Sequence, residues 1–116
     1  MMVLVQGTNE FADYGIFLRA MSVALSGMQE DDKYFYIYSL GPSKINSFAQ
    51  EFVNLSERGM KARNKKIKTY RVTQQWVTKN ISDFNYFAYL SGPKQYPSSI
   101  AKFAKDNGIE LGIFQY

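Results

Sequence analysis

The sequence contains neither cysteine nor histidine. Their absence excludes thiol nucleophiles, the usual zinc sites, serine triads and imidazole acid–base chemistry. No apolar run approaches the roughly 18 residues that a membrane span needs, and no signal-peptide pattern opens the chain. We therefore expect a cytoplasmic protein with no membrane partner, no metal and no resident cofactor, in which any catalysis would use carboxylates, Lys, Tyr, Ser or Thr.

Apolar and aromatic residues are plentiful, at 46% and 16% of 116 residues. This is enough material for one hydrophobic core and too little length for two ordinary domains, so we expect a single domain over residues 1–116. The formal net charge of +4 is unevenly spread. Seven basic residues occur with no acid between them, at Arg58, Lys61, Arg63, Lys65, Lys66, Lys68 and Arg71. They create a local positive field.

Hydrophobic periodicity predicts alternating strands and helices. Strands are expected at residues 3–5, 34–40, 67–72, 86–90 and 109–114. Helices are expected at residues 11–28, from an N-cap at Ser43 to about Arg58, and from Ser98 or Ser99 to Asn107. Because no Asn-Gly type signal joins neighbouring strands as a hairpin, the pattern predicts an α/β, Rossmann-like, doubly wound domain with about five mainly parallel strands and helices on both faces.

Glycine-bearing segments follow three of the expected strands. They read GTNEF from Gly7, GPSKIN from Gly41 and SGPKQYPSS from Ser91. In doubly wound sheets such segments meet at the carboxyl edge, where loop amides and helix starts favour an anion. The sequence therefore predicts a pocket for a phosphate or a nucleotide at this edge.

These segments also resemble motifs of a known family. Residues 7–13 are similar to the GSRxFxD opening of the YspA-like branch of the SLOG superfamily. Residues 41–52 resemble its glycine-rich turn and following helix, Trp76 stands where its tryptophan follows the third strand, and residues 91–104 resemble its closing stretch. The resemblance implies a Rossmann-like fold that binds nucleotides or nucleotide-derived signals, as a sensor or a sponge. The PGGxGTxxE signature of the LOG phosphoribohydrolases is absent, so turnover is not implied.

Together, the two lines of reasoning give one set of candidate ligand-binding residues. They are Gly7, Thr8, Asn9, Glu10, Phe11, Asp13, Gly41, Pro42, Ser43, Lys44, Asn46, Trp76, Ser91, Gly92, Lys94, Ser98 and Ser99. Each type also has a structural interpretation. Glu10 and Asp13 suit the first turn of any helix, Ser43 suits a cap, and Trp76 suits a packed core.

Two other functions remain open. The size and the Lys-, Asn- and aromatic-rich composition resemble accessory proteins of T-even type phages, which implies binding to a host enzyme such as an aminoacyl-tRNA synthetase in the host cytoplasm. Cleavage of a nucleotide's N-glycosidic bond by Glu10 or Glu51 is a third hypothesis, although no partner that would tune a carboxylate is evident.

The basic stretch at residues 58–71 has two interpretations. Tyr70 and its basic neighbours could bind a nucleic acid by stacking and phosphate contacts. We favour the alternative, in which Lys66, Lys68 and Tyr70 form the solvent-facing side of a strand. The surplus of tyrosine also suits a partner interface, so we expect a homo-oligomer.

Overall fold

The computed structural model describes residues 1–92 and 98–115. Five parallel strands form one sheet in the order β3-β2-β1-β4-β5. The strands are β1 (Met2–Gly7), β2 (Tyr34–Leu40), β3 (Lys66–Arg71), β4 (Tyr86–Ser91) and β5 (Glu110–Gln115). The predicted α/β class with a parallel, doubly wound sheet is confirmed.

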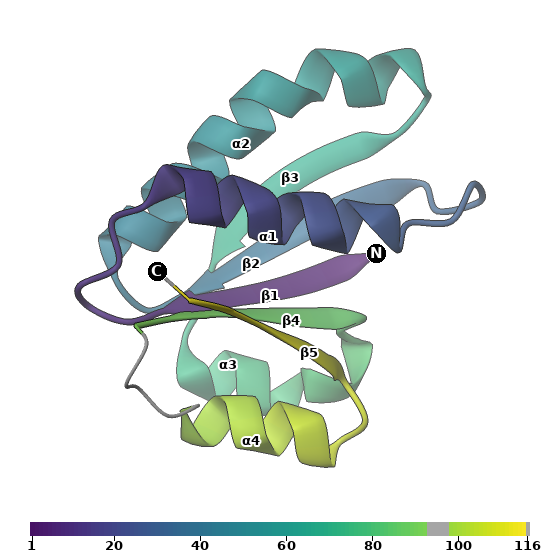
Figure 1. Cartoon of the computed structure of the whole chain (residues 1–116). Helices are drawn as coiled ribbons and strands as arrows, with labels where there is room; N and C mark the ends of the chain where they lie inside the picture. Colours follow the sequence, from purple (N-terminus) through teal and green to yellow (C-terminus); the bar gives the residue numbers. More distant parts are fainter. Residues whose placement is uncertain (93–97, 116) are drawn as a thin grey trace.

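Helices cover both faces of this sheet. They are α1 (Tyr14–Ser26), α2 (Ser43–Ala62), α3 (Gln74–Lys79) with the short 3₁₀ turn η1 (Ile81–Asp83), and α4 (Ser99–Asp106). Figure 1 shows α1 and α2 on one face and α3 and α4 on the other. No helix in the described part of the chain is long and apolar enough to cross a membrane.

The sheet separates two layers of buried side chains. Along β1, Val3 and Val5 belong to the layer under α1 and α2, whereas Leu4 belongs to the layer under α3 and α4. This alternation follows from the two-residue period of a strand. Because both faces are covered at the centre, β4 is buried along its whole length and reads as a continuous apolar run.

The boundaries predicted for the first two helices were wrong. The helix expected from Phe11 begins at Tyr14, because the side chain of Asp13 accepts a hydrogen bond from the Ile16 amide at 3.1 Å and caps the helix there. Glu10 consequently lies in the loop before the helix and not in its first turn. Such caps are preferred start signals because they satisfy an otherwise unpaired helical amide.

The second expected helix also differs at both ends. Pro42, not Ser43, is the N-cap, and no side chain caps the first turn. The helix continues past Arg58 to Ala62 because its apolar face continues to the buried Met60. Gly59 is exposed within it and is tolerated at a modest loss of helix propensity.

Candidate functional site

The strand order reverses between β1 and β4, and the loops that follow the two strands leave in opposite directions. In open α/β sheets this reversal marks the usual ligand site at the carboxyl edge. The Thr8 amide donates to the carbonyl of Leu90 at 3.2 Å, which joins the two strand ends. The hydroxyl of Ser98, at the start of α4, donates to Oε1 of Gln6 at 2.7 Å. The loops after β1 and β4 thus meet at one edge.

The turn after β2 reaches the same place. Gly41 has a φ of +108°, and a Cβ added to it would lie 3.3 Å from the carbonyl oxygen of Gly7. A glycine is required here both for the left-handed backbone and for this close approach. The described ends of all three predicted segments therefore lie together along the carboxyl edge, which we call the rim.

Several of the predicted ligand-binding residues hold the fold. A Cβ added to Gly7 would lie 2.5 Å from Cδ1 of Ile45, so α2 packs directly on this glycine. Phe11 is buried and meets the Phe48 ring edge-on, with 6.0 Å between the centroids. Asn46 accepts a hydrogen bond from the Ser39 hydroxyl at 3.1 Å. These contacts place Gly7, Phe11 and Asn46 beneath the rim rather than on it.

Helix caps account for two more predicted residues. Asp13 caps α1, and the hydroxyl of Ser98 accepts from the Ala101 amide at 3.2 Å to cap α4. Both side chains remain at the rim, because each helix starts there. Each side chain stabilises the start of its own helix, as the structural interpretation of these residue types predicted.

Most of the remaining predicted residues lie at the surface of the rim. Thr8 and Pro42 are half-buried, and Gly92 is buried. Asn9, Glu10, Gly41, Ser43, Lys44 and Ser99 are exposed. Lys44 Nζ lies 6.0 Å from the centre of the Phe48 ring, beside the start of α2. Lys94 lies outside the described residues.

One buried hydroxyl at the rim has no partner. Ser91 ends β4 and is 1% exposed, and its Oγ forms no hydrogen bond in the described structure. Buried hydroxyls in proteins are almost always paired, so the Ser91 hydroxyl is an exception.

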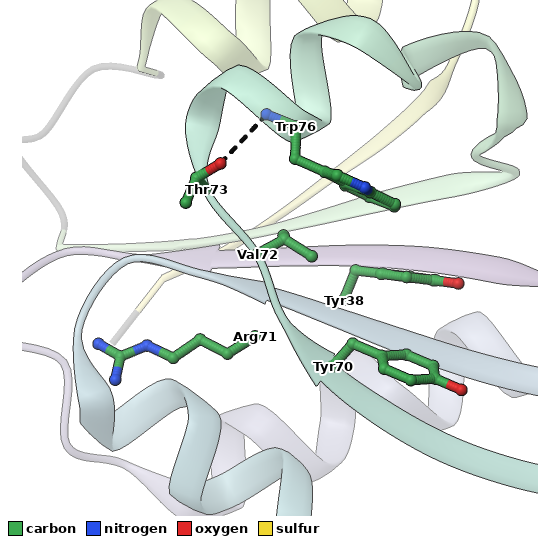
Figure 2. A pocket seen from close by; sticks show the side chains of 6 residues that line it. All are labelled: Tyr38, Tyr70, Arg71, Val72, Thr73 and Trp76. Atoms are coloured by element: carbon green, nitrogen blue, oxygen red, sulfur yellow. Dashed lines mark hydrogen bonds between the residues drawn. The ribbon is translucent and has the colours of Figure 1, made fainter.

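Trp76 lies apart from these loops, in a pocket beside the carboxyl end of β3. The pocket has a volume of about 440 Å³ and is lined by Tyr38, Tyr70, Arg71, Val72, Thr73 and Trp76. Figure 2 shows the hydrogen bond from the Trp76 amide to the Thr73 hydroxyl, 3.2 Å long, that caps α3 and fixes the start of the helix.

Three rings of this pocket stack in series. Tyr38 lies between Tyr70 and Trp76, with ring centroids at 5.3 Å and 5.1 Å and interplanar angles of 24° and 17°. Burial raises the pKa of Tyr38, and nearby ionisable groups, Tyr70 first among them, raise it further. The side chain of Arg71 points the other way (Figure 2) and donates to the carbonyl of Gly41 at 3.3 Å. Arg71 thus links the pocket to the rim.

Trp76 was a predicted site residue, and Tyr70 and Arg71 belong to the basic stretch considered for nucleic-acid binding, whereas Tyr38 was not predicted to line a site. The signal for Tyr38 was the alternation Tyr34, Tyr36, Tyr38, which puts three tyrosines on one face of β2. Nothing in the sequence identifies Arg71 among its basic neighbours.

The two carboxylates considered for catalysis lie on different elements of the fold. Glu10 lies in the loop after β1, and Glu51 lies on the exposed side of α2. Burial raises the pKa of Tyr14, and the negative charge of Glu51 raises it further. Within residues 1–92 and 98–115, no group of three Asp or Glu residues is arranged to hold a metal ion.

Comparison with protein-family models gives no match for this chain, and no curated protein matches it. The resemblance to the SLOG superfamily therefore rests on the motifs alone and stays a prediction. The function has to be argued from the geometry.

Proposed function

We propose that the protein binds a nucleotide or a nucleotide-derived small molecule at the rim, without obligatory turnover. The reversal of strand order between β1 and β4 carries this proposal. It brings the loops after both strands, and the starts of α1 and α4, to one place on the sheet. The aligned peptide dipoles of these helices place their positive ends there and favour a phosphate.

Two further features support a phosphate-bearing ligand. The turn at Gly41 leads into α2, whose first turn contains no acidic residue, and Lys44 is exposed at that helix start. The unpaired Ser91 hydroxyl at the end of β4 offers a hydrogen-bond donor for a ligand oxygen. Glu10 and Glu51 lie on different elements, in the loop after β1 and on α2, and we favour capture over hydrolysis.

The proposal is tested by thermal unfolding with a panel of mononucleotides, dinucleotides and cyclic nucleotides. A ligand present at 100 times its Kd stabilises the folded state by about 2.7 kcal/mol. We expect one class of nucleotide to raise the unfolding temperature, and the absence of any shift across the panel would refute nucleotide capture.

Matched variants locate the site. Asn9→Asp adds a charge to the exposed loop after β1 without changing side-chain size, and we expect it to weaken nucleotide binding at least tenfold through repulsion of the phosphate. Asn54→Asp makes the same change on the exposed side of α2, away from the helix start, and should leave binding unchanged. Equal effects of the two variants would contradict a rim site.

Ser43→Asp separates ligand binding from stability. An acid at the start of α2 interacts favourably with the helix dipole and should stabilise the ligand-free protein by about 0.3–1 kcal/mol. The same carboxylate occupies the predicted phosphate position and should abolish the stabilisation by nucleotide. A variant that is more stable and still binds would exclude the start of α2 from the site.

A further inference from the structure

A continuous row of aromatic rings crosses the sheet on the face that carries α3. Tyr34 meets Tyr36 with centroids 4.4 Å apart, and Tyr36 meets Tyr70 of the neighbouring strand at 5.8 Å. The row continues through Tyr38 and Trp76, stacked as described above, and reaches Phe84, whose ring meets that of Tyr38 at 5.3 Å. We call these six residues the aromatic row.

Two lysines of β3 lie opposite tyrosines of the row. In the pairing of β2 with β3, Lys66 is opposite Tyr34, Lys68 is opposite Tyr36, and Tyr70 is opposite Tyr38. Side chains two residues apart project from the same face of a strand, so Lys66 and Lys68 share the face of Tyr70. Ile67, between them, is buried in the layer on the opposite face. The result is a surface of alternating rings and ammonium groups.

Part of this surface is open to solvent. Tyr34 is 37% exposed and Tyr70 is 42% exposed, and Lys66 and Lys68 are exposed as well. Parallel sheets usually have both faces covered by helices. Trp76 and Phe84 cover the row at its far end, so the open portion runs from Tyr34 to Tyr70 and ends at the pocket in Figure 2.

From this surface we infer that the protein binds single-stranded nucleic acid along β2 and β3. Flat bases stack on tyrosine faces without regard to sequence, and the lysines neutralise the phosphates between them. The charge of the two strands fits this ligand, since β2 and β3 contain no Asp or Glu, and Asp83, whose charge acts on Tyr38, lies in η1 at the covered end of the row. The pocket accepts one base against Trp76 at the end of the strand.

This site is distinct from the rim, although Arg71 of the pocket donates to the carbonyl of Gly41. The rim lies along the carboxyl edge at the ends of β1, β2 and β4, whereas the aromatic row lies on the face of β2 and β3. The ligands differ too, because the ligand proposed for the rim is a nucleotide-sized molecule, whereas the row requires several consecutive bases. Failure of one proposal therefore leaves the other standing.

Fluorescence anisotropy with labelled twelve-residue oligo-uridine, oligo-thymidine and a duplex of equal length tests the inference. We expect both single strands to bind and the duplex to bind at least tenfold more weakly, because its bases are not available for stacking. The two single strands distinguish an RNA ligand from a DNA ligand. No binding of either at low salt would overturn the proposal.

Stacking is tested at Tyr70. Tyr70→Ala should weaken binding at least fivefold, and Tyr70→Phe should retain it, because the stacking ring remains. Phe103→Ala removes an equally exposed ring from α4, away from the row, and should have no effect. Equal losses for Tyr70→Ala and Phe103→Ala would contradict stacking at the row.

Phosphate contact is tested by salt dependence. In the double variant Lys66→Gln/Lys68→Gln, the slope of log affinity against log salt should fall by about 1.4, because each contact to single-stranded nucleic acid contributes roughly 0.7. The control Lys102→Gln/Lys105→Gln removes the same charge from exposed positions of α4 and should leave the slope unchanged. An identical change in both would mean a general effect of net charge and would overturn the assignment.

The alternative is that a second copy of the chain binds this face. Light scattering at the concentrations used for anisotropy detects such a dimer. A stable dimer that Tyr70→Ala converts to a monomer, with no binding of single strands, would overturn the inference. We expect a wild-type species whose mass is the same before and after Tyr70→Ala.

Discussion

At the scale of single residues, Gly112 of β5 packs tightly against the ring of Tyr86. A Cβ added to Gly112 would lie 1.8 Å from the Tyr86 hydroxyl oxygen and 2.9 Å from Cζ of the same ring. Tyr86 is buried, so its ring has little room to move away. Gly112 is therefore required by space rather than by backbone conformation.

The first prediction follows from this contact. Gly112→Ala should lower the free energy of unfolding by about 1–3 kcal/mol through overpacking. Tyr86→Phe removes the hydroxyl that the new methyl group meets first, so the double variant should be more stable than the sum of the two single changes by at least about 0.5 kcal/mol. Urea unfolding of the four proteins measures the coupling, and strict additivity would contradict it.

Lys65 is the buried basic residue of the stretch at residues 58–71. It is 8% exposed, and its ammonium group donates to the carbonyls of Glu30 at 3.0 Å, Gln29 at 3.4 Å and Asp32. These three donated hydrogen bonds offset the loss of hydration of the ammonium group. Lys65 thereby ties the connection between α1 and β2 to the start of β3.

A second prediction concerns this tie. Lys65→Met keeps the length of the side chain but loses the charged donors, and it should lower the free energy of unfolding by about 1.5–3 kcal/mol. Lys66→Met, at the exposed neighbouring position, should change it by less than about 0.5 kcal/mol. Guanidinium unfolding compares the two, and similar losses would show that Lys65 has no special role.

At the scale of helices and strands, periodicity predicted every strand and the three longer helices, because apolar spacing is a local property of the chain. Boundaries were less predictable. The choice between Phe11 and Tyr14 as the start of α1 was decided by the Asp13 cap, which competes with several polar neighbours in the sequence. The extent of α2 was decided by burial of Met60 against other elements.

The aromatic row shows why a site can be missed while its strands are found. One face of β2 is indicated by the alternating residues Tyr34, Tyr36 and Tyr38. One face of β3 is indicated in the same way by Lys66, Lys68 and Tyr70. The pairing of these two strands in this register depends on the whole sheet and is not encoded in either segment. The rim was easier to predict, because the carboxyl ends of parallel strands always share an edge.

At the scale of the whole molecule, tyrosine ionisation couples folding to alkaline pH. Burial raises the pKa values of Tyr14, Tyr38 and Tyr86 above the ordinary value of 10.0. The folded state therefore holds these protons more tightly than the unfolded state. The stabilisation is complete below about pH 10 and is lost as the pH rises through the folded-state values.

The loss of stability at alkaline pH gives a third prediction. The free energy of unfolding should fall as the pH rises above about 10, and Tyr14→Phe should fall less steeply than the wild type. Because the Tyr14 hydroxyl is buried without a partner, its removal should not reduce stability at pH 7. Urea titrations at several alkaline pH values provide the test, with an unchanged slope in Tyr14→Phe as the contrary result.

The parallel arrangement of the strands also decides how the protein should be handled. Because β1 begins at the amino edge and β5 ends at the carboxyl edge, the first and last described residues lie at opposite edges of the sheet (Figure 1). An affinity tag attached after β5 would emerge beside the rim and compete with a small ligand for it. A tag placed ahead of β1 leaves that edge clear and is the better choice for purification before binding assays.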